Sequence, residues 1–151
     1  MRMAGAGDVL EGILDRIRAA TGGRVLVVDD DEVVRGFVGD ALRAEGYAVA
    51  AAPDAGAALD LLWAAWEDQP DVILLDLLLP AVDGRGFTDL YRQLPVRHAP
   101  IVLMSALDEL EQIAAETGAA AGLRKPFDLD VLLATVARYA RPDSSQPPPE
   151  A

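Results

Sequence analysis

The sequence PDVILLDLLLPAVDG, at residues 70–84, decides the fold of this chain. A short apolar run between turn signals is typical of a strand buried on both faces. Asp76 follows where this strand leaves the sheet, and Pro80 with the Asp83–Gly84 pair closes the next loop. Open α/β sheets bind ligands at the carboxyl ends of their strands. Taken alone, however, Asp76 fits a solvent-exposed helix cap better than a functional carboxylate.

Composition limits the classes of function open to the chain. Its 151 residues suffice for one domain with a substantial core, and a hydrophobic content of 52% argues against global disorder. The net charge of -12 disfavours binding to nucleic acids or anionic membranes and suits a basic partner or a bound cation. The absence of cysteine excludes thiol catalysis and fits a reducing cytosol, so we expect a cytoplasmic protein. A single histidine, His98, disfavours a histidine metal cage or a Ser–His–Asp triad. We expect neither a signal peptide nor a membrane span.

Apolar periodicity and turn residues predict five strands that alternate with five helices. The helices are expected to begin near Asp31, Asp54, Gly84, Asp108 and Asp128. The strands are expected at 24–28, at 47–51, in the run before Asp76, at 100–104 and at 119–124. We expect Phe37 on the inner face of its helix, and we interpret the two tryptophans as packing residues, one of them partly exposed.

This alternation predicts a parallel sheet covered by helices on both faces. With five strands, the expected fold is flavodoxin-like, with strand order 2-1-3-4-5 and a switch point between strands one and three. We assign residues 24–140 to this domain, 1–23 to an N-terminal extension and 141–151 to a disordered Pro/Ser-rich tail. Within the extension, residues 8–20 predict an extra amphipathic helix that packs on the domain, a second copy or another partner.

Polar residues end four of the predicted strands. Asp29 and Asp30 follow the first strand, Asp76 the third, Ser105 the fourth and Lys125 the fifth. Because the carboxyl ends of parallel strands share one edge of the sheet, three carboxylates should converge there. Their repulsion favours a bound cation, and Mg²⁺ prefers one or two carboxylates together with a phosphate. Lys125 and Ser105 could hold a phosphoryl group on Asp76, because an aspartate can act as a covalent nucleophile.

Each of these residues also has a plain structural interpretation. The aspartates after the first strand could cap the next helix, and for Asp31 we prefer that role. Ser105 could be a turn residue, and Lys125 could be a solvated surface residue. Their joint position, each at the end of a different strand, favours a site over four unrelated features.

The chain resembles the response regulator receiver domains of two-component signalling, which have a chemotaxis-regulator-like fold. The matching motifs are VVDDD at 27–31, LLDLLLPAVDG at 74–84, VLMSA at 102–106 and KPF at 125–127. They occur in the order and at the spacing of the family, over about residues 24–140. As a set they are highly specific, although each alone is weak.

The resemblance implies a Mg²⁺ site at the acidic residues. Its ligands would be Asp30, Asp76 and the backbone carbonyl of Leu78, with Asp29 acting through water. The same resemblance makes Asp76 the phosphoacceptor.

Two more site residues follow from the resemblance. It implies that the hydroxyl of Ser105 moves to the phosphoryl oxygens on activation and that Lys125 contacts the phosphate. It also implies a cis Lys125–Pro126 peptide bond, since only X–Pro bonds adopt cis at low cost.

Two departures from the family pattern affect the expected output. Receiver domains often carry Tyr or Phe three residues before the site lysine, where this chain has Gly122. We therefore expect phosphorylation without the usual aromatic switch, with output through the loop after strand four and the helix that follows it. Leu78 and Leu107 occupy positions that tune phosphoryl hydrolysis in the family, and two apolar side chains predict a slowly decaying phosphoform.

The favoured function is a non-enzymatic receiver module that accepts phosphate from a sensor histidine kinase or a histidine phosphotransfer protein. We expect it to signal to a downstream protein, without a DNA-binding output domain in this chain, and to form a homodimer if residues 8–20 pair. One alternative is a phosphorylation-independent adaptor. A haloacid-dehalogenase-type phosphatase is a weaker alternative, because that family needs an aspartate at the position of Leu78.

Overall fold

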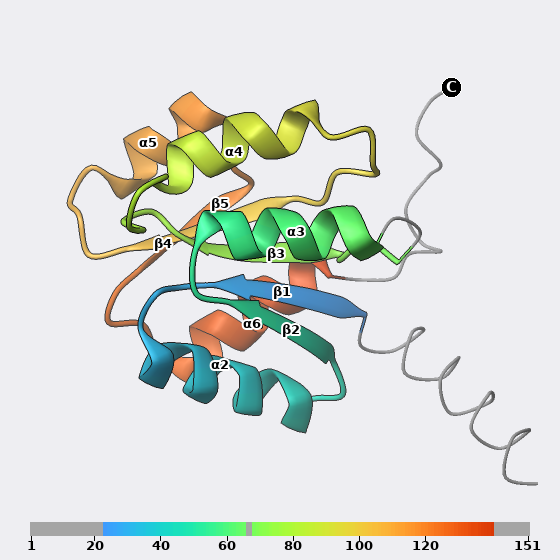
Figure 1. The fold of residues 1–151 in the computed structure, drawn as a ribbon. Coiled ribbons are helices and arrows are strands. Elements are labelled where there is room, and N and C mark those ends of the chain that lie inside the picture. The colour runs from blue at the N-terminus through green and yellow to red at the C-terminus, as the bar shows by residue number, and fades with distance from the viewer. Residues whose placement is uncertain (1–22, 66–67, 141–151) are drawn as a thin grey trace, which may run out of the picture.

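A computed structural model describes residues 23–65 and 68–140 of the chain (Figure 1). The predicted helix at 8–20, the predicted tail at 141–151 and Trp66 lie outside the described residues. Strands and helices alternate in the described part, in the order β1 (Arg24–Val28), α2 (Glu32–Ala44), β2 (Ala48–Ala52), α3 (Ala55–Ala65), β3 (Val72–Asp76), α4 (Gly84–Gln93), β4 (Ile101–Ser105), α5 (Leu110–Thr117), β5 (Ala121–Arg124) and α6 (Leu129–Tyr139).

The five strands form one parallel sheet in the order β2-β1-β3-β4-β5, which confirms the flavodoxin-like prediction. The register pairs Val28 of β1 with Leu75 of β3, and Asp76 with Met104 of β4. All five strands therefore end at one edge, where open α/β sheets place their ligands.

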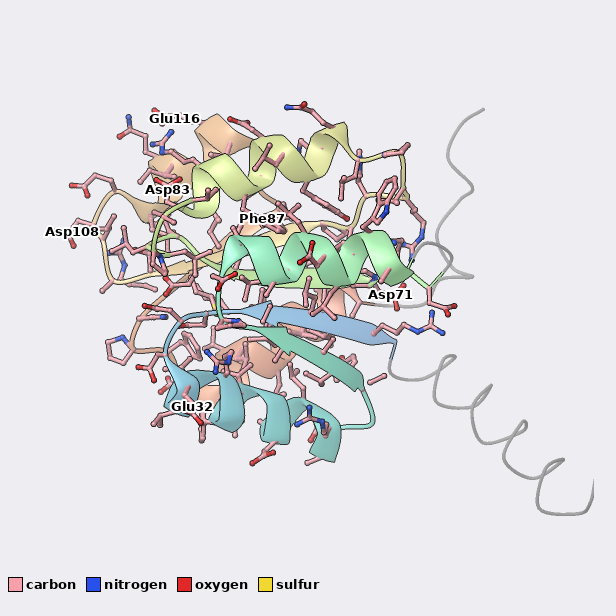
Figure 2. All side chains as sticks on the ribbon, viewed as in Figure 1. Glu32, Asp71, Asp83, Phe87, Asp108 and Glu116 are labelled. Atoms are coloured by element: carbon pink, nitrogen blue, oxygen red, sulfur yellow. The ribbon has the colours of Figure 1, made fainter. Side chains whose placement is uncertain are left out.

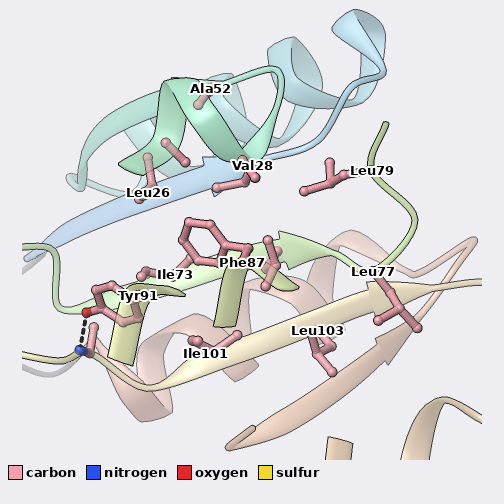
Figure 3. Close-up of a cluster of buried hydrophobic side chains, with 14 of the residues drawn as sticks. Leu26, Val28, Ala52, Ile73, Leu77, Leu79, Phe87, Tyr91, Ile101 and Leu103 are labelled. Atoms are coloured by element: carbon pink, nitrogen blue, oxygen red, sulfur yellow. Dashed lines mark hydrogen bonds between the residues drawn. The ribbon is translucent and has the colours of Figure 1, made fainter. Parts of the chain in front are cut away.

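Two apolar layers cover the sheet, because β1, β3 and β4 direct alternate apolar side chains to opposite faces. On one face, α3, α4 and α5 pack over Leu26, Ile73 and Leu103, together with Phe87 and Tyr91 (Figure 3). The Tyr91 hydroxyl accepts a hydrogen bond of 2.6 Å from the amide of Ala99. On the other face lie α2 and α6 (Figure 1).

Local signals account for the helix boundaries next to the sheet edge. The carboxylate of Asp31 accepts hydrogen bonds from the amides of Val33 and Val34, which confirms the capping role expected for Asp31. Asp83 caps α4 in the same way through the amide of Gly86. Most predicted strands and helices begin or end within about two residues of their observed bounds, as is usual for frayed ends.

The prediction that Phe37 is buried was wrong. Its side chain is 55% exposed, whereas Val38 and Leu42 of the same helix are fully buried. Phe37 instead lines an open groove with Val33 of the same helix and with Pro126 and Phe127. Trp63 is 54% exposed, as expected for one of the two tryptophans. Within the described residues, no helix is both long and apolar enough to cross a membrane.

Candidate functional site

The strand ends bring the predicted site residues to one edge of the sheet. Oxygen atoms of Asp29, Asp30 and Asp76 all lie within 4.8 Å of one another. The backbone amide of Lys125 donates to the carbonyl of Ser105 at 2.9 Å, which joins the last two strand ends beside these carboxylates. The structure thus brings together all five polar residues that the sequence singled out.

Lys125 is paired with the carboxylates rather than with solvent. Its Nζ lies 2.8 Å from Oδ2 of Asp29 and 3.4 Å from Oδ2 of Asp76. Burial lowers the pKa of Lys125, but the hydrogen bond and charge of Asp29 and the charge of Asp76 raise it above its ordinary value overall. Lys125 therefore carries a fixed positive charge at neutral pH. Asp29 itself is fully buried, and its Oδ1 accepts from the amide of Asp31 at 2.9 Å.

The ionised form of Asp76 is disfavoured by its surroundings in the cluster. It is only 6% exposed, and its Oδ1 accepts a hydrogen bond of 3.2 Å from the amide of Leu78. Burial and then the negative charge of Asp29 raise the pKa of Asp76 from 3.8 to about 6, although Lys125 and the Leu78 amide oppose this change. At pH 7 the carboxylate is mostly ionised but poorly stabilised, which makes it responsive to a cation or a reaction partner.

The donor set fits a hard divalent cation. Three carboxylates converge, all their ligand atoms are oxygens, and burial followed by the charge of Asp29 raises the pKa of Asp76 despite the nearby Lys125. Asp30 is exposed and lines an open hollow together with Leu78, Pro80 and Asp83, so the cluster is reached from solvent.

The hydroxyl of Ser105 is buried at the same edge. Ser105 is 1% exposed, and its Oγ accepts a hydrogen bond of 3.1 Å from the amide of Leu107. This bond fixes the start of the loop between β4 and α5. The Lys125–Pro126 peptide bond is cis, as the resemblance implied.

The loop after Asp76 approaches the strand so closely that it requires glycine. A Cβ on Gly84 would lie 2.9 Å from Cα of Leu77 and 3.1 Å from the carbonyl oxygen of Asp76. The amide of Gly84 donates to the carbonyl of Leu77 at 2.8 Å, which holds the loop in place. Ala81, in the same loop, has a φ of 65°, a left-handed conformation that is costly for alanine.

Two residues at the site were missed by the sequence reasoning. Arg35 donates from Nη1 to the carbonyl oxygen of Asp29 at 2.7 Å and so supports the end of β1. A positive charge is unfavourable near the amino end of a helix, so an arginine in the first turn of α2 is a sequence signal that could have drawn attention to Arg35. Leu110 of α5 is fully buried and packs against Gly122. A Cβ added to Gly122 would lie only 2.9 Å from Cγ of Leu110. The space beside the glycine is thus filled from α5.

Comparisons of sequence agree with this geometry. The sequence model of the response regulator receiver domain matches residues 25–137. The chain is 36% identical over 137 residues to the alkaline phosphatase synthesis transcriptional regulatory protein SphR of Synechococcus elongatus, a match covering 85% of this chain and 53% of that protein. It is 38% identical over 122 residues to the response regulator MprA of Mycolicibacterium vanbaalenii, covering 78% and 50% respectively. The chain therefore spans about half the length of these curated relatives.

Solved structures give the same result. The chemotaxis response regulator CheY4 of Vibrio cholerae matches with a TM-score of 0.71 and 32% identity, over 79% of this chain and 99% of that chain. The receiver domain of the Francisella response regulator 1452 matches with a TM-score of 0.69 and 29% identity, over 78% and 96%. The fold, the acidic strand ends and these matches together show that the chain belongs to the response regulator receiver domain family of two-component systems.

Proposed function

We propose that this chain accepts a phosphoryl group on Asp76 from a sensor histidine kinase or a histidine phosphotransfer protein and passes the signal on through protein contacts. The observation that carries the proposal is the buried, poorly stabilised carboxylate of Asp76, with Asp29 beside it and Nζ of Lys125 at 3.4 Å. Receiver domains are in general signalling domains rather than enzymes, and they bind Mg²⁺ at an acidic pocket.

In the proposed reaction, a carboxylate oxygen of Asp76 attacks the phosphorus of a phosphohistidine. The P–O bond forms as the P–N bond breaks, and the bonding electrons pass to the leaving imidazole, which takes up a proton. Such transfers need positioning and charge neutralisation more than covalent chemistry by the protein. Lys125 supplies a positive charge next to the attacking oxygen and would then pair with the phosphoryl oxygens. The Leu78 amide orients the Asp76 carboxylate through its hydrogen bond.

A divalent cation at this site would neutralise charge on the phosphoryl oxygens. Asp30, Asp76 and the backbone carbonyl of Leu78 would hold it directly, and Asp29 would hold it through water. The proposal agrees with the short distances among the three carboxylates. Ser105, already at the strand edge, would exchange its bond to the Leu107 amide for one to the phosphoryl group.

Labelling with acetyl phosphate and Mg²⁺ tests the proposal without a kinase. Intact mass should increase by one phosphoryl group in the native chain and in Asp83→Asn, and it should not increase in Asp76→Asn. Asp83→Asn is a matched control, because asparagine also caps helices and Asp83 lies in the loop that follows the site. Absence of label on the native chain would reject the proposal and favour a phosphorylation-independent adaptor.

The phosphodonor protein would dock on an apolar groove next to the site. Phe37 and Val33 of α2, with exposed fractions of 55% and 78%, face Pro126 and Phe127 across a groove of about 400 Å³. Lys125 lines the same groove, so a partner bound there presents its histidine near Asp76. Exposed apolar patches of this kind mark interaction sites.

A matched pair of variants tests this docking surface. Phe37→Ala should slow transfer from a phosphorylated donor protein and leave acetyl phosphate labelling unchanged. Leu90→Ala serves as the control, because Leu90 is 43% exposed on α4, which packs on the opposite face of the sheet. Equal transfer to both variants would place the donor elsewhere.

The output route is proposed to run through the loop after β4 and through α5. Ser105 holds the start of this loop, and Leu110 occupies the space beside Gly122 where other receiver domains often carry a ring. Movement of Ser105 would thus pull directly on α5. Beryllofluoride with Mg²⁺ should shift backbone amide resonances across residues 105–117, and unchanged resonances there would refute this route.

A further inference from the structure

An apolar groove lies along the outer strand of the sheet, at the end away from Asp76. It has a volume of about 220 Å³ and is lined by Ala48 and Ala50 of β2 and by Leu61 of α3. Both alanines are exposed, and Leu61 is 40% exposed. The groove exists because the alanines of this strand are too small to fill the space between the sheet and α3.

The chain enters the described part of the structure at the rim of this groove. The carbonyl of Gly23 accepts a hydrogen bond of 3.0 Å from the amide of Ala48, and Arg24 lines the groove. The amide of Arg24 donates to Oδ2 of Asp71 at 2.8 Å. Gly23 has a φ of 83°, and a Cβ there would lie 2.7 Å from the carbonyl oxygen of Ala140. The direction of the chain at the rim is therefore fixed by its contacts (Figure 2 shows Asp71 at this end of the sheet).

The residues that precede this point in the sequence carry an apolar stripe. Residues 8–20 lie outside the described residues, but their sequence predicts an amphipathic helix with an apolar face, formed by Val9, Leu10, Ile13, Leu14 and Ile17. We propose that residues 8–20 pack this stripe into the groove between β2 and α3 of their own chain. A cavity of about 150 Å³ holds a benzene molecule, so the groove accommodates at least one branched aliphatic side chain.

Chain length permits this packing. Residues 21–23 span up to about 10 Å when extended, which leaves the predicted helix close to its point of attachment. Ala50 lies two residues beyond Ala48, about 7 Å along the strand, and Ala48 is the register partner of Arg24. The groove beside Phe37 is at the opposite end of the strands and is a poorer match for a tethered segment.

Charge and tethering favour the same chain over a second copy. The net charge of -12 makes two copies repel each other. A segment joined by a short linker is present at an effective concentration in the millimolar range, far above that of a free partner in a dilute sample. Packing of the apolar stripe into the groove of the same chain is therefore favoured over packing into the groove of a second copy.

Because the native chain has no cysteine, engineered disulfides test this packing in the complete protein. Ile13→Cys combined with Ala50→Cys should oxidise to an intramolecular disulfide at micromolar protein concentration, with monomer mass and no free thiol. Asp15→Cys with Ala50→Cys is the matched control on the opposite face of the predicted helix. Ile13→Cys with Ala51→Cys is the control on the opposite face of the strand.

Both controls should form the disulfide more slowly, by roughly tenfold or more, because disulfides require Cβ atoms about 4 Å apart. Equal rates of disulfide formation in the three double variants would overturn the proposal, because they would show that residues 8–20 do not pack into the groove in a fixed orientation. A disulfide-linked dimer would identify a second copy as the occupant and would also overturn it. Cooperative urea denaturation of each variant establishes that the domain is folded, so the proposal does not depend on the outcome for native Asp76 phosphorylation.

Discussion

Replacement of Asp76 by asparagine should stabilise the metal-free protein at neutral pH while it removes the phosphoacceptor. The folded protein holds this carboxylate beside Asp29 in a buried position, where its charge is unfavourable. An asparagine of nearly the same shape keeps an oxygen for the Leu78 amide and carries no charge. Asp76 would thus lower the free energy of unfolding of the unphosphorylated, metal-free protein, although it is needed for function.

The magnitude follows from the pKa of Asp76, which is raised from 3.8 to about 6. At about 1.36 kcal/mol per pH unit, this difference corresponds to about 3 kcal/mol. Because the folded-state pKa is the higher one, the native state holds the proton more tightly than the unfolded state. The cost is therefore absent below about pH 3.8, grows between pH 3.8 and pH 6, and is complete at pH 7.

Urea denaturation in the presence of EDTA measures this effect. At pH 7, Asp76→Asn should raise the free energy of unfolding by up to about 3 kcal/mol, and the gain should shrink towards zero near pH 4. Added Mg²⁺ should narrow the gap by stabilising the native chain, with Asp83→Asn as the control. An Asp76→Asn protein that is less stable than the native chain at pH 7, or a gain that does not change with pH, would refute the reasoning.

Three further predictions concern neighbouring positions. Gly122→Ala should cost about 1–3 kcal/mol by overpacking and much less in a Leu110→Ala background; equal costs in urea denaturation would contradict the packing described here. Ala81→Gly should raise the free energy of unfolding by about 0.5–1 kcal/mol, because the φ of 65° suits glycine; a loss of stability would contradict this. Leu78→Asn should speed decay of the phosphoform several-fold, because a polar side chain can orient water; the rate is measured by loss of phosphoprotein mass, and an unchanged rate would exclude a role for Leu78.

The fold and the location of the site were predictable because both depend on short-range patterns. The alternation of apolar runs and helices requires a parallel sheet, and the end of each run then places its polar residue at one edge. Asp76 and Lys125, far apart in sequence, are 3.4 Å apart for this reason alone. The strand order was predicted because the flavodoxin-like order is a common one for a doubly wound sheet of five strands.

Side-chain environments were less predictable because they depend on what lies across from each residue. Phe37 has the spacing of a buried residue, yet its side chain lines an open groove opposite Pro126 and Phe127. Arg35 donates to the backbone carbonyl of Asp29, and its place in the first turn of α2 marks it as unusual but does not identify this acceptor. The sequence showed that the ring is missing at Gly122, but it could not show that Leu110 fills the space, because that depends on how α5 sits on β5.

The bond between Lys125 and Asp29 links residues that are 96 positions apart, directly after β5 and β1, the last and first strands in the sequence. A phosphoryl group that attracts this ammonium competes with a contact that holds the domain together. Reaction at Asp76 would therefore disturb a contact between the segments that follow β1 and β5. Amide hydrogen exchange in β1 and at the start of α6 should report whether Asp76 carries a phosphoryl group.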